Sequence, residues 1–139
     1  MMYKTLSKAL NLSQAINSPY DLVDLARQGL FKSAINSLAE LLELPAKDLV
    51  QYLHISERTL QRYDEKKKLS PELSDHLIQL ARVYARAVEV FGDQNKAVKW
   101  LKYPILALGG VTPISCLDNF SGIELVLDEL GLIEYGVYA

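Results

Sequence analysis

Residues Leu49–Tyr63 read LVQYLHISERTLQRY, and this stretch decides the fold. Its apolar side chains recur at the spacing that two short helices need when they cross at a tight turn and bury a common face. They are Leu49, Val50, Leu53, Ile55, Leu60 and Tyr63. Ser56 precedes the second helix, where its hydroxyl can accept a hydrogen bond from a backbone amide one turn on. The stretch therefore predicts a helix-turn-helix, with helices over 46–53 and 57–68.

The outer face of the second helix carries side chains suited to DNA. Arg, Gln and Thr at the N-terminal end of such a helix contact base edges in the major groove, and a basic cluster farther along can hold phosphates. The predicted DNA-binding residues are Ser56, Arg58, Thr59, Gln61, Arg62, Lys66, Lys67 and Lys68. An ordinary solvated helix is the alternative, since Glu57, Asp64 and Glu65 reduce the local net charge to about +2.

Two positions depart from the common helix-turn-helix pattern. The turn carries His54 where glycine is usual, and the first helix carries Val50 where a small residue is usual. Histidine tolerates a left-handed backbone better than β-branched residues do, so the turn can still form. Val50 is expected to hold the two helices slightly farther apart.

Charge is distributed unevenly along the 139 residues, although the formal net charge is only −2. All 15 Lys and Arg lie at or before Lys102, so the segment 103–139 contains acidic residues and no basic ones. A mildly basic first part and an acidic, apolar last part imply two surfaces with different partners. A short acidic tail that only improves solubility is the alternative.

The rest of the chain is predicted to be almost entirely helical, because apolar residues recur at helical spacing between strong capping signals. Gly29 (in the left-handed conformation), Pro45, Gly92 and Gly131 are expected to end helices, while Ser70-Pro71, Asp93, Thr112-Pro113 and the capping box Ser121 to Glu124 begin them. The predicted helices span 19–28, 32–44, 46–53, 57–68, 71–91, 94–102 and 123–130. The closing residues LIEYGVYA are expected to form a short extended tail.

The predicted helix over 71–91 carries two apolar stripes. One stripe contains Leu73, Leu77, Leu80, Tyr84, Ala87 and Phe91, and the other contains Ile78, Ala81, Ala85 and Val88. One stripe can pack on the helix-turn-helix, which leaves the other for the C-terminal unit or for a second copy of the chain.

Catalytic chemistry has little support in this sequence. His54 and His76 have no Cys or acid at metal-ligand spacing near both, and Cys116 has no His nearby. Gly109-Gly110 lacks the preceding strand and the following Lys of a phosphate loop. We therefore expect no catalytic site, no metal and no cofactor.

The sequence is also typical of a cytoplasmic protein. No run approaches the roughly 18 apolar residues of a membrane span, and the N-terminus lacks the pattern of a signal peptide. The single cysteine forms no internal disulfide. We expect no membrane association.

A group of residues in the C-terminal third forms a pattern that recurs in a known family. It comprises Phe91-Gly92-Asp93, Ala97, Trp100-Leu101, Pro104, Leu108-Gly109-Gly110, Thr112-Pro113, Gly122 and Ile133-Glu134-Tyr135-Gly136. This pattern resembles the toxin-binding domain of the Xre/MbcA/ParS antitoxins. Upstream, Ser56-Glu57-Arg58-Thr59-Leu60 and Leu69-Ser70 are similar to the helix-turn-helix unit of the same family. The resemblance covers about residues 30–138.

The resemblance implies an all-α fold. An Xre-like helix-turn-helix unit over 1–69 would pack with a long linking helix and a small helical toxin-binding domain over 70–139. It also implies the antitoxin of a bacterial type II toxin–antitoxin system, whose partner would be a RES-domain toxin that degrades NAD. The antitoxin would cover the toxin's active site. It would also bind double-stranded promoter DNA as an autorepressor, as a homodimer within a larger complex.

The residues that the resemblance places at the toxin are Trp100, Gly109, Gly110, Thr112, Pro113, Glu134, Tyr135, Gly136 and Tyr138. A cleft that binds a dinucleotide diphosphate should be basic, and Glu134 lies in the segment without Lys or Arg that could complement it. Trp100, Tyr135 and Tyr138 are the expected aromatic anchors. Core packing is the alternative for Trp100.

Two other functions stay open at this point. The chain could be a stand-alone transcriptional regulator whose acidic C-terminal unit dimerises or senses a ligand. It could also neutralise a toxin without binding DNA, since the charge of the recognition helix is modest and its turn carries His54.

Overall fold

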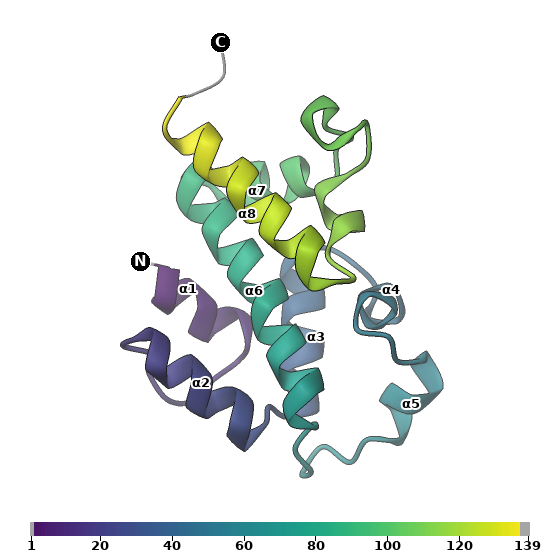
Figure 1. Ribbon diagram of the computed structural model, residues 1–139. Helices are drawn as coiled ribbons and strands as arrows, with labels where there is room; N and C mark the ends of the chain where they lie inside the picture. The colour runs from purple at the N-terminus through teal and green to yellow at the C-terminus, as the bar shows by residue number, and fades with distance from the viewer. Residues whose placement is uncertain (1, 137–139) are drawn as a thin grey trace.

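The computed structural model describes residues 2–136, and those residues form an all-α fold, as predicted (Figure 1). The α-helices are α1 (Met2–Ala9), α2 (Pro19–Gln28), α3 (Lys32–Leu41), α4 (Ala46–Tyr52), α5 (Glu57–Arg62), α6 (Pro71–Phe91), α7 (Gln94–Leu101) and α8 (Phe120–Glu134). Two 3-10 helices, η1 (Leu106–Leu108) and η2 (Pro113–Cys116), lie between α7 and α8. Tyr138, predicted to contact a partner, lies outside the described residues.

Helix α6 runs through the middle of the molecule, and the other helices are arranged around it (Figure 1). Its N-cap is Ser70, whose hydroxyl accepts a hydrogen bond from the backbone amide of Leu73, and Pro71 occupies the first helical position. Helices α1 and α2 pack on α6, and so do α7 and α8. Gly92 ends α6 in the left-handed conformation, as predicted.

Both apolar stripes of α6 are buried within the chain. Leu77 and Leu80 of the first stripe are almost fully buried, and so are Ile78, Ala81 and Ala85 of the second. The helices that pack on α6 from both halves of the chain therefore cover the stripe that the sequence left open for a second copy.

One polar side chain in this core holds three segments together. The Ser74 hydroxyl is fully buried on α6. It accepts a hydrogen bond from the backbone amide of Leu30 at 2.9 Å and donates one to the carbonyl oxygen of Leu69 at 3.4 Å. Because a buried hydroxyl without partners costs free energy, these two bonds fix the α2–α3 connection and the start of α6 relative to each other.

Helices α4 and α5 form the predicted helix-turn-helix. Its apolar side chains Leu49, Val50, Leu53 and Leu60 are buried against the core. Ser56 caps α5, since its hydroxyl accepts from the amide of Thr59 at 3.0 Å. His54 adopts φ +61°, the left-handed backbone that its turn requires.

Several predicted helix ends were wrong, and α1 was missed. Helix α3 ends at Leu41 instead of Leu44 because a turn with Glu43 at φ +55° precedes Pro45. Gly29 does have a positive φ, but its ψ of 148° lies outside the left-handed helical region. Helix α1 is short and lacks the Pro, Gly and Ser signals on which the other predictions depended.

The predicted end of the chain was wrong as well. Asn119, and not Ser121, caps α8, because its side-chain oxygen accepts a hydrogen bond from the amide of Gly122 at 2.9 Å. The helix continues through Gly131 to Glu134, so the first three residues of the expected extended tail are helical, while 137–139 lie outside the described residues. Tertiary contacts along α8 outweigh the weak helix preference of one glycine.

Gly29 is required by the packing at the start of α6. A Cβ atom there would lie 2.6 Å from the carbonyl oxygen of Leu69, and φ is +90°. We expect Gly29→Ala to lower the free energy of unfolding by about 2 kcal/mol, because backbone strain and a clash act together. Urea unfolding of the full chain measures this loss.

Gly131→Ala is the matched control. Nothing lies within 4 Å of a Cβ at that helical position, so alanine should leave stability unchanged or raise it by about 0.5–1 kcal/mol. An equal loss in both variants would contradict the role assigned to Gly29.

Candidate nucleic-acid interface and partner surface

Helix α5 presents its polar face to solvent, as the sequence predicts for a helix that reads DNA. The predicted residues on it, Arg58, Thr59, Gln61 and Arg62, are all exposed, and so is the cap Ser56. Leu60 is 5% exposed and anchors the opposite face. The six residues of α5 therefore combine one apolar anchor with an outer face of long polar side chains.

The lysine cluster lies in a loop and not on the recognition helix, which corrects the prediction of a helix over 57–68. Helix α5 ends at Arg62, and Asp64 organises the turn that follows. Its carboxylate accepts from the amide of Lys66 at 2.9 Å, and its carbonyl oxygen accepts from the amide of Lys67 at 3.0 Å. Asp64 competes for the backbone amides of the next residues, and this competition ends the helix.

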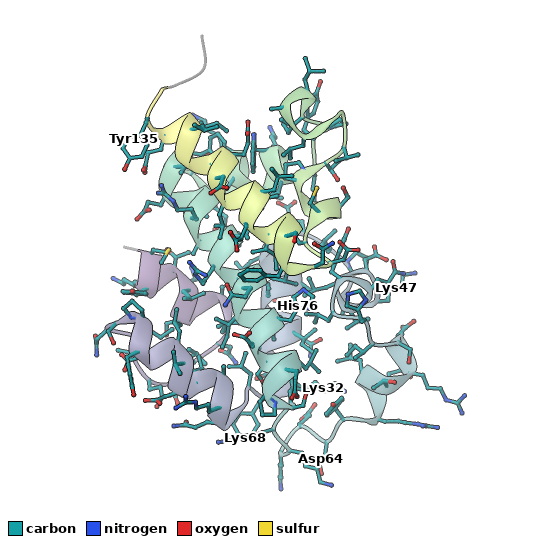
Figure 2. The ribbon with its side chains drawn as sticks, viewed as in Figure 1. Lys32, Lys47, Asp64, Lys68, His76 and Tyr135 are labelled. Atoms are coloured by element: carbon teal, nitrogen blue, oxygen red, sulfur yellow. The ribbon has the colours of Figure 1, made fainter. Side chains whose placement is uncertain are left out.

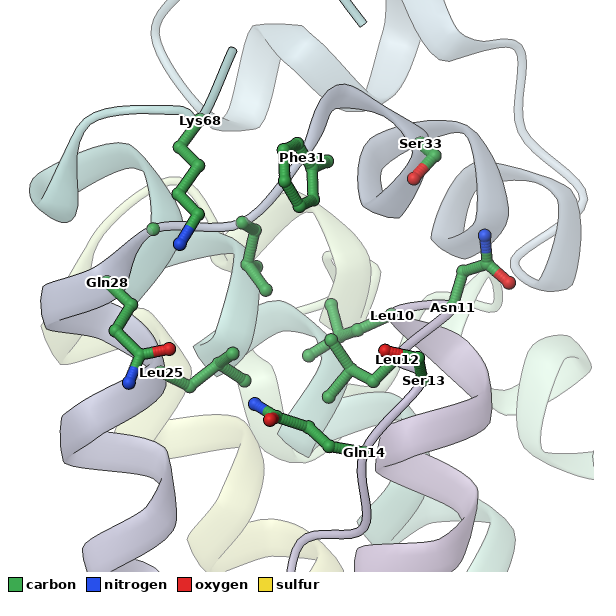
Figure 3. A pocket seen from close by; sticks show the side chains of 12 residues that line it. Leu10, Asn11, Leu12, Ser13, Gln14, Leu25, Gln28, Phe31, Ser33 and Lys68 are labelled. Atoms are coloured by element: carbon green, nitrogen blue, oxygen red, sulfur yellow. The ribbon is translucent and has the colours of Figure 1, made fainter. Parts of the chain in front are cut away.

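The end of this loop is fixed to the α2–α3 connection. Lys68 and Phe31 form an isolated antiparallel bridge, and the amide of Leu69 donates to the carbonyl oxygen of Leu30 at 2.7 Å. The Lys68 ammonium lies 5.9 Å from the centre of the Phe31 ring, within range of a cation–π attraction. Both side chains line a hollow of about 240 Å³ that α2 and the segment after α1 close from the other side (Figure 3).

Two lysines that the sequence reasoning missed lie on the same part of the molecule. Figure 2 shows Lys32, at the start of α3, near Lys68 and Asp64 at the lower end, and Lys47, in the first turn of α4, farther up on the right. The first helix of a helix-turn-helix crosses the DNA backbone, where a lysine can contact a phosphate. Their positions near α5 depend on how the helices pack, so the sequence pattern gave no signal for them.

The segment between α7 and α8 forms a compact loop. Ile105 and Val111 form an antiparallel bridge, which Gly109 and Gly110 close with φ values of +81° and +86°. Thr112 begins η2 by accepting from the amide of Ser115, as its cap pattern predicts, although the helix is 3-10. Gly109 and Gly110 are exposed, Thr112 is half-buried and Pro113 is buried.

An apolar groove lies between this loop and the C-terminal half of α8. Ile105, Leu106, Ala107 and Ile133 line it together with Glu129. Leu106 is 92% exposed. The sequence reasoning missed Leu106 because a leucine in a helical protein is expected in the core.

Other large apolar side chains are exposed on the same half of the chain. They are Tyr103, Val111, Phe120, Leu125, Leu132 and Tyr135. Together with the groove beside Leu106, these side chains make this half of the chain a candidate interaction site. Tyr135, one of the predicted anchors, is 80% exposed at the end of α8.

Trp100 lies half-buried against the core. Its ring centre is 5.7 Å from that of Phe91, with the rings inclined at 43°. This geometry is a favourable aromatic contact within the chain. Its predicted role as a partner anchor stays a prediction.

Glu134 forms an ion pair with Arg86 that ties the end of α8 to α6. The two guanidinium nitrogens of Arg86 donate to the two carboxylate oxygens at 2.7 and 2.8 Å, and Arg86 also donates to Glu89 at 2.6 Å. The bidentate bond lowers the pKa of Glu134 and raises that of Arg86.

The described residues offer neither a cluster of metal ligands nor a helix that could cross a membrane. Within residues 2–136, no three His, Cys, Asp or Glu side chains come close enough together to hold a metal ion. None of the helices in that range combines the length and apolar character that crossing a membrane requires.

The Arg86–Glu134 pair should make stability depend on pH in the acid range. The lowered pKa of Glu134 means that its contribution is complete above the ordinary value of 4.5 and is lost as the pH falls through the lower folded value. We expect wild type to be more stable than Glu134→Gln at pH 7 and the difference to shrink steadily below pH 4.5. Urea unfolding at a series of pH values measures it.

Glu124→Gln removes another exposed carboxylate of α8 and serves as the control. A stability difference between wild type and Glu134→Gln that persists unchanged at acid pH would contradict the ion-pair account.

Comparison with known proteins agrees with this division of the surface. Residues 21–82 match the family described as the antitoxin Xre-like helix-turn-helix domain. Residues 86–136 match the family described as the antitoxin Xre/MbcA/ParS C-terminal toxin-binding domain.

Individual relatives are named as antitoxins. The chain is 32% identical over 120 residues to Antitoxin Xre of Yersinia enterocolitica, across 85% of this chain and 81% of that protein. It is 41% identical over 78 residues to Antitoxin Xre of Photorhabdus laumondii, across 55% and 53%. It is also 25% identical over 147 residues to the Prs ADP-ribosylating antitoxin of a Sphingobium species, across 99% and 87%.

Proposed function

Because the chain belongs to the Xre/MbcA/ParS family of antitoxins, we propose that it neutralises a RES-domain toxin that degrades NAD and represses its own promoter. The toxin is held by the C-terminal half, which covers the toxin's active site. The promoter is held by the helix-turn-helix. Both activities take place in the cytoplasm.

The exposed apolar groove beside η1 is the observation that supports toxin binding. It lies within residues 86–136, the stretch similar to a toxin-binding domain. A side chain such as Leu106, exposed at 92%, is stabilised by inserting into an apolar pocket of a partner. Gly109 and Gly110 let the backbone of the loop approach that partner closely.

Charge supports the same surface. No Lys or Arg follows Lys102, and Glu124 and Asp128 are exposed on α8. A toxin cleft that binds the diphosphate of NAD is basic, so these acids complement its rim. Glu134 already pairs with Arg86, and its role is therefore to hold the end of α8 and Tyr135 in place.

The DNA side depends on α5. Arg58, Thr59 and Arg62 are exposed at the helix that a helix-turn-helix inserts into the major groove. Lys66, Lys67 and Lys68 follow in a loop fixed to the core, where they can contact phosphates. Lys32 and Lys47 are candidates for further phosphate contacts.

The two surfaces lie at opposite ends of the molecule. Figure 2 shows Tyr135 at the upper end and Lys32, Asp64 and Lys68 at the lower end, beyond the start of α6. A helix of 21 residues spans about 30 Å. One chain can thus hold DNA and toxin together, with 1–69 and 70–139 as the two functional units and a homodimer matching two half-sites of the promoter.

A second candidate concerns the chemistry of the toxin. One relative is named a Prs ADP-ribosylating antitoxin, and ADP-ribosyl transfer takes its group from NAD. The partner could thus transfer ADP-ribose to a protein instead of degrading NAD. Loss of cellular NAD on toxin expression supports degradation, whereas a modified protein at steady NAD supports transfer.

Leu106→Asp tests the toxin surface. Placing a carboxylate in an apolar pocket should weaken binding to the co-purified toxin about 30-fold or more and abolish protection of cells. Binding is measured by isothermal titration calorimetry and protection by co-expression.

Tyr20→Asp is the matched control, since Tyr20 is 69% exposed on α2, outside the stretch similar to a toxin-binding domain. It should bind toxin as wild type does. If Leu106→Asp still binds toxin as wild type does, the groove is not part of the interface.

Arg58→Ala combined with Arg62→Ala tests the DNA surface. Loss of base and phosphate contacts should abolish binding to the chain's own promoter and leave toxin binding intact. An electrophoretic shift assay at fixed salt measures it. Lys4→Ala with Lys99→Ala removes equal charge from exposed sites on α1 and α7 and should retain promoter binding.

Loss of both activities in the arginine variant would mean that α5 is structural. Affinity capture of the tagged chain from its own cells separates the alternatives: a stoichiometric RES-type protein supports the antitoxin, whereas recovery of DNA alone supports a stand-alone regulator.

A further inference from the structure

Two histidines, His54 in the turn of the helix-turn-helix and His76 on α6, contact the segment that leads into α8. Nε2 of His54 lies 2.6 Å from the carbonyl oxygen of Asp118, and Nε2 of His76 lies 2.9 Å from that of Leu117. A carbonyl oxygen only accepts, so both imidazoles donate from Nε2. The two rings lie 6.0 Å apart, and Figure 2 shows His76 between α6 and α8. We call these two bonds the histidine clasp.

The clasp connects the two stretches that the family comparison separates. His54 and His76 lie within 21–82, and the two carbonyl groups lie within 86–136. Tyr52 on α4 also senses this segment, since burial and then the carboxylates of Asp48 and Asp118 raise the pKa of its phenol. The junction is thus a set of specific contacts between these two stretches.

The backbone conformation at His54 does not by itself require a histidine side chain. The residue adopts φ +61°, where glycine would fit without a conformational cost. A histidine at this position therefore contributes something that the turn itself does not need. Its side chain bonds the carbonyl oxygen of Asp118 and lies near the ring of His76.

The orientation of α5 depends on this turn. The helix has six residues and packs mainly on α4, with Leu60 as its buried residue. Only Ile55 separates His54 from the cap Ser56, so the position of the imidazole sets where α5 begins. A shift of the segment 117–118 moves the recognition helix.

The other side of the clasp is continuous with the proposed toxin surface. From Leu106 the chain passes through Gly109 and Gly110 into η2, which packs on α7 and α8 and ends next to Leu117. A partner bound to the 105–112 loop therefore displaces the segment 117–118, which carries both carbonyl groups.

We propose that His54 and His76 are positioning residues that couple the two binding surfaces, so that a partner bound to one unit changes the order and affinity of the other. This inference rests on the proposed function, since it requires a chain that binds DNA. Coupling of this kind is reciprocal and is transmitted by elements with specific contacts at both ends.

Amide hydrogen exchange of the full chain tests the coupling with a DNA fragment of its own promoter as the probe. The reporters are the amides of Leu117, Gly122 and Ile123, which are hydrogen-bonded within the C-terminal unit and lie away from α5. In wild type, saturating DNA should slow their exchange about fivefold or more.

The variants His54→Gly and His54→Asn remove the imidazole and introduce residues that also tolerate a positive φ. Each is measured at a DNA concentration that saturates it, and neither should show slowing at the three amides. Asn11→Gly, at an exposed residue with φ +55° outside the clasp, should behave as wild type.

The outcomes distinguish the two proposals. Protection in wild type that disappears in both His54 variants supports the clasp. Bound DNA without any protection of these amides, or protection that survives both substitutions, overturns it and leaves the antitoxin proposal intact. If the wild-type chain does not bind its promoter, the proposed repressor function is wrong, and the inference is overturned with it.

Discussion

Burial of helix α6 is the constraint on which the rest of the structure depends. Its two apolar stripes face the N-terminal helices and the C-terminal helices, so neither half of the chain completes its core without it. The buried hydroxyl of Ser74 fixes how the α2–α3 connection lies on α6, because it forms hydrogen bonds with the backbone of both Leu30 and Leu69. Apolar burial supplies most of the free energy, and the polar contacts select one arrangement.

The same helix explains how one small chain presents two different surfaces. The parts proposed to bind DNA are gathered around its beginning, where the loop 63–69 is fixed to Phe31 and Leu30. The groove beside Leu106 and the end of α8 lie toward its other end, where Arg86 holds Glu134. Since α6 is rigid, the separation of the surfaces is fixed, and communication between them depends on side contacts such as the histidine clasp.

Local signals predicted those elements that begin and end with strong caps. The Ser56 and Ser70 caps, Gly92 and Asp93 all act as the sequence indicated, because each satisfies orphan amides or ends a helix within a few residues. The errors fall where tertiary contacts decide. Asp64 ends α5 early, and packing carries α8 through Gly131, where a single glycine costs little.

The sequence by itself determined the all-α fold, the helix-turn-helix and the family, since these follow from apolar periodicity, capping residues and a residue pattern of local spacing. It also indicated the outer face of α5 as the surface for DNA. Only the tertiary structure decided that Leu106 is exposed, that Trp100 packs on Phe91, that Glu134 pairs with Arg86 and that Lys68 is fixed to Phe31. Each of these facts joins residues that are distant in the chain or depends on which side of a helix is covered. Such relations are set by packing around α6, and no local pattern encodes them.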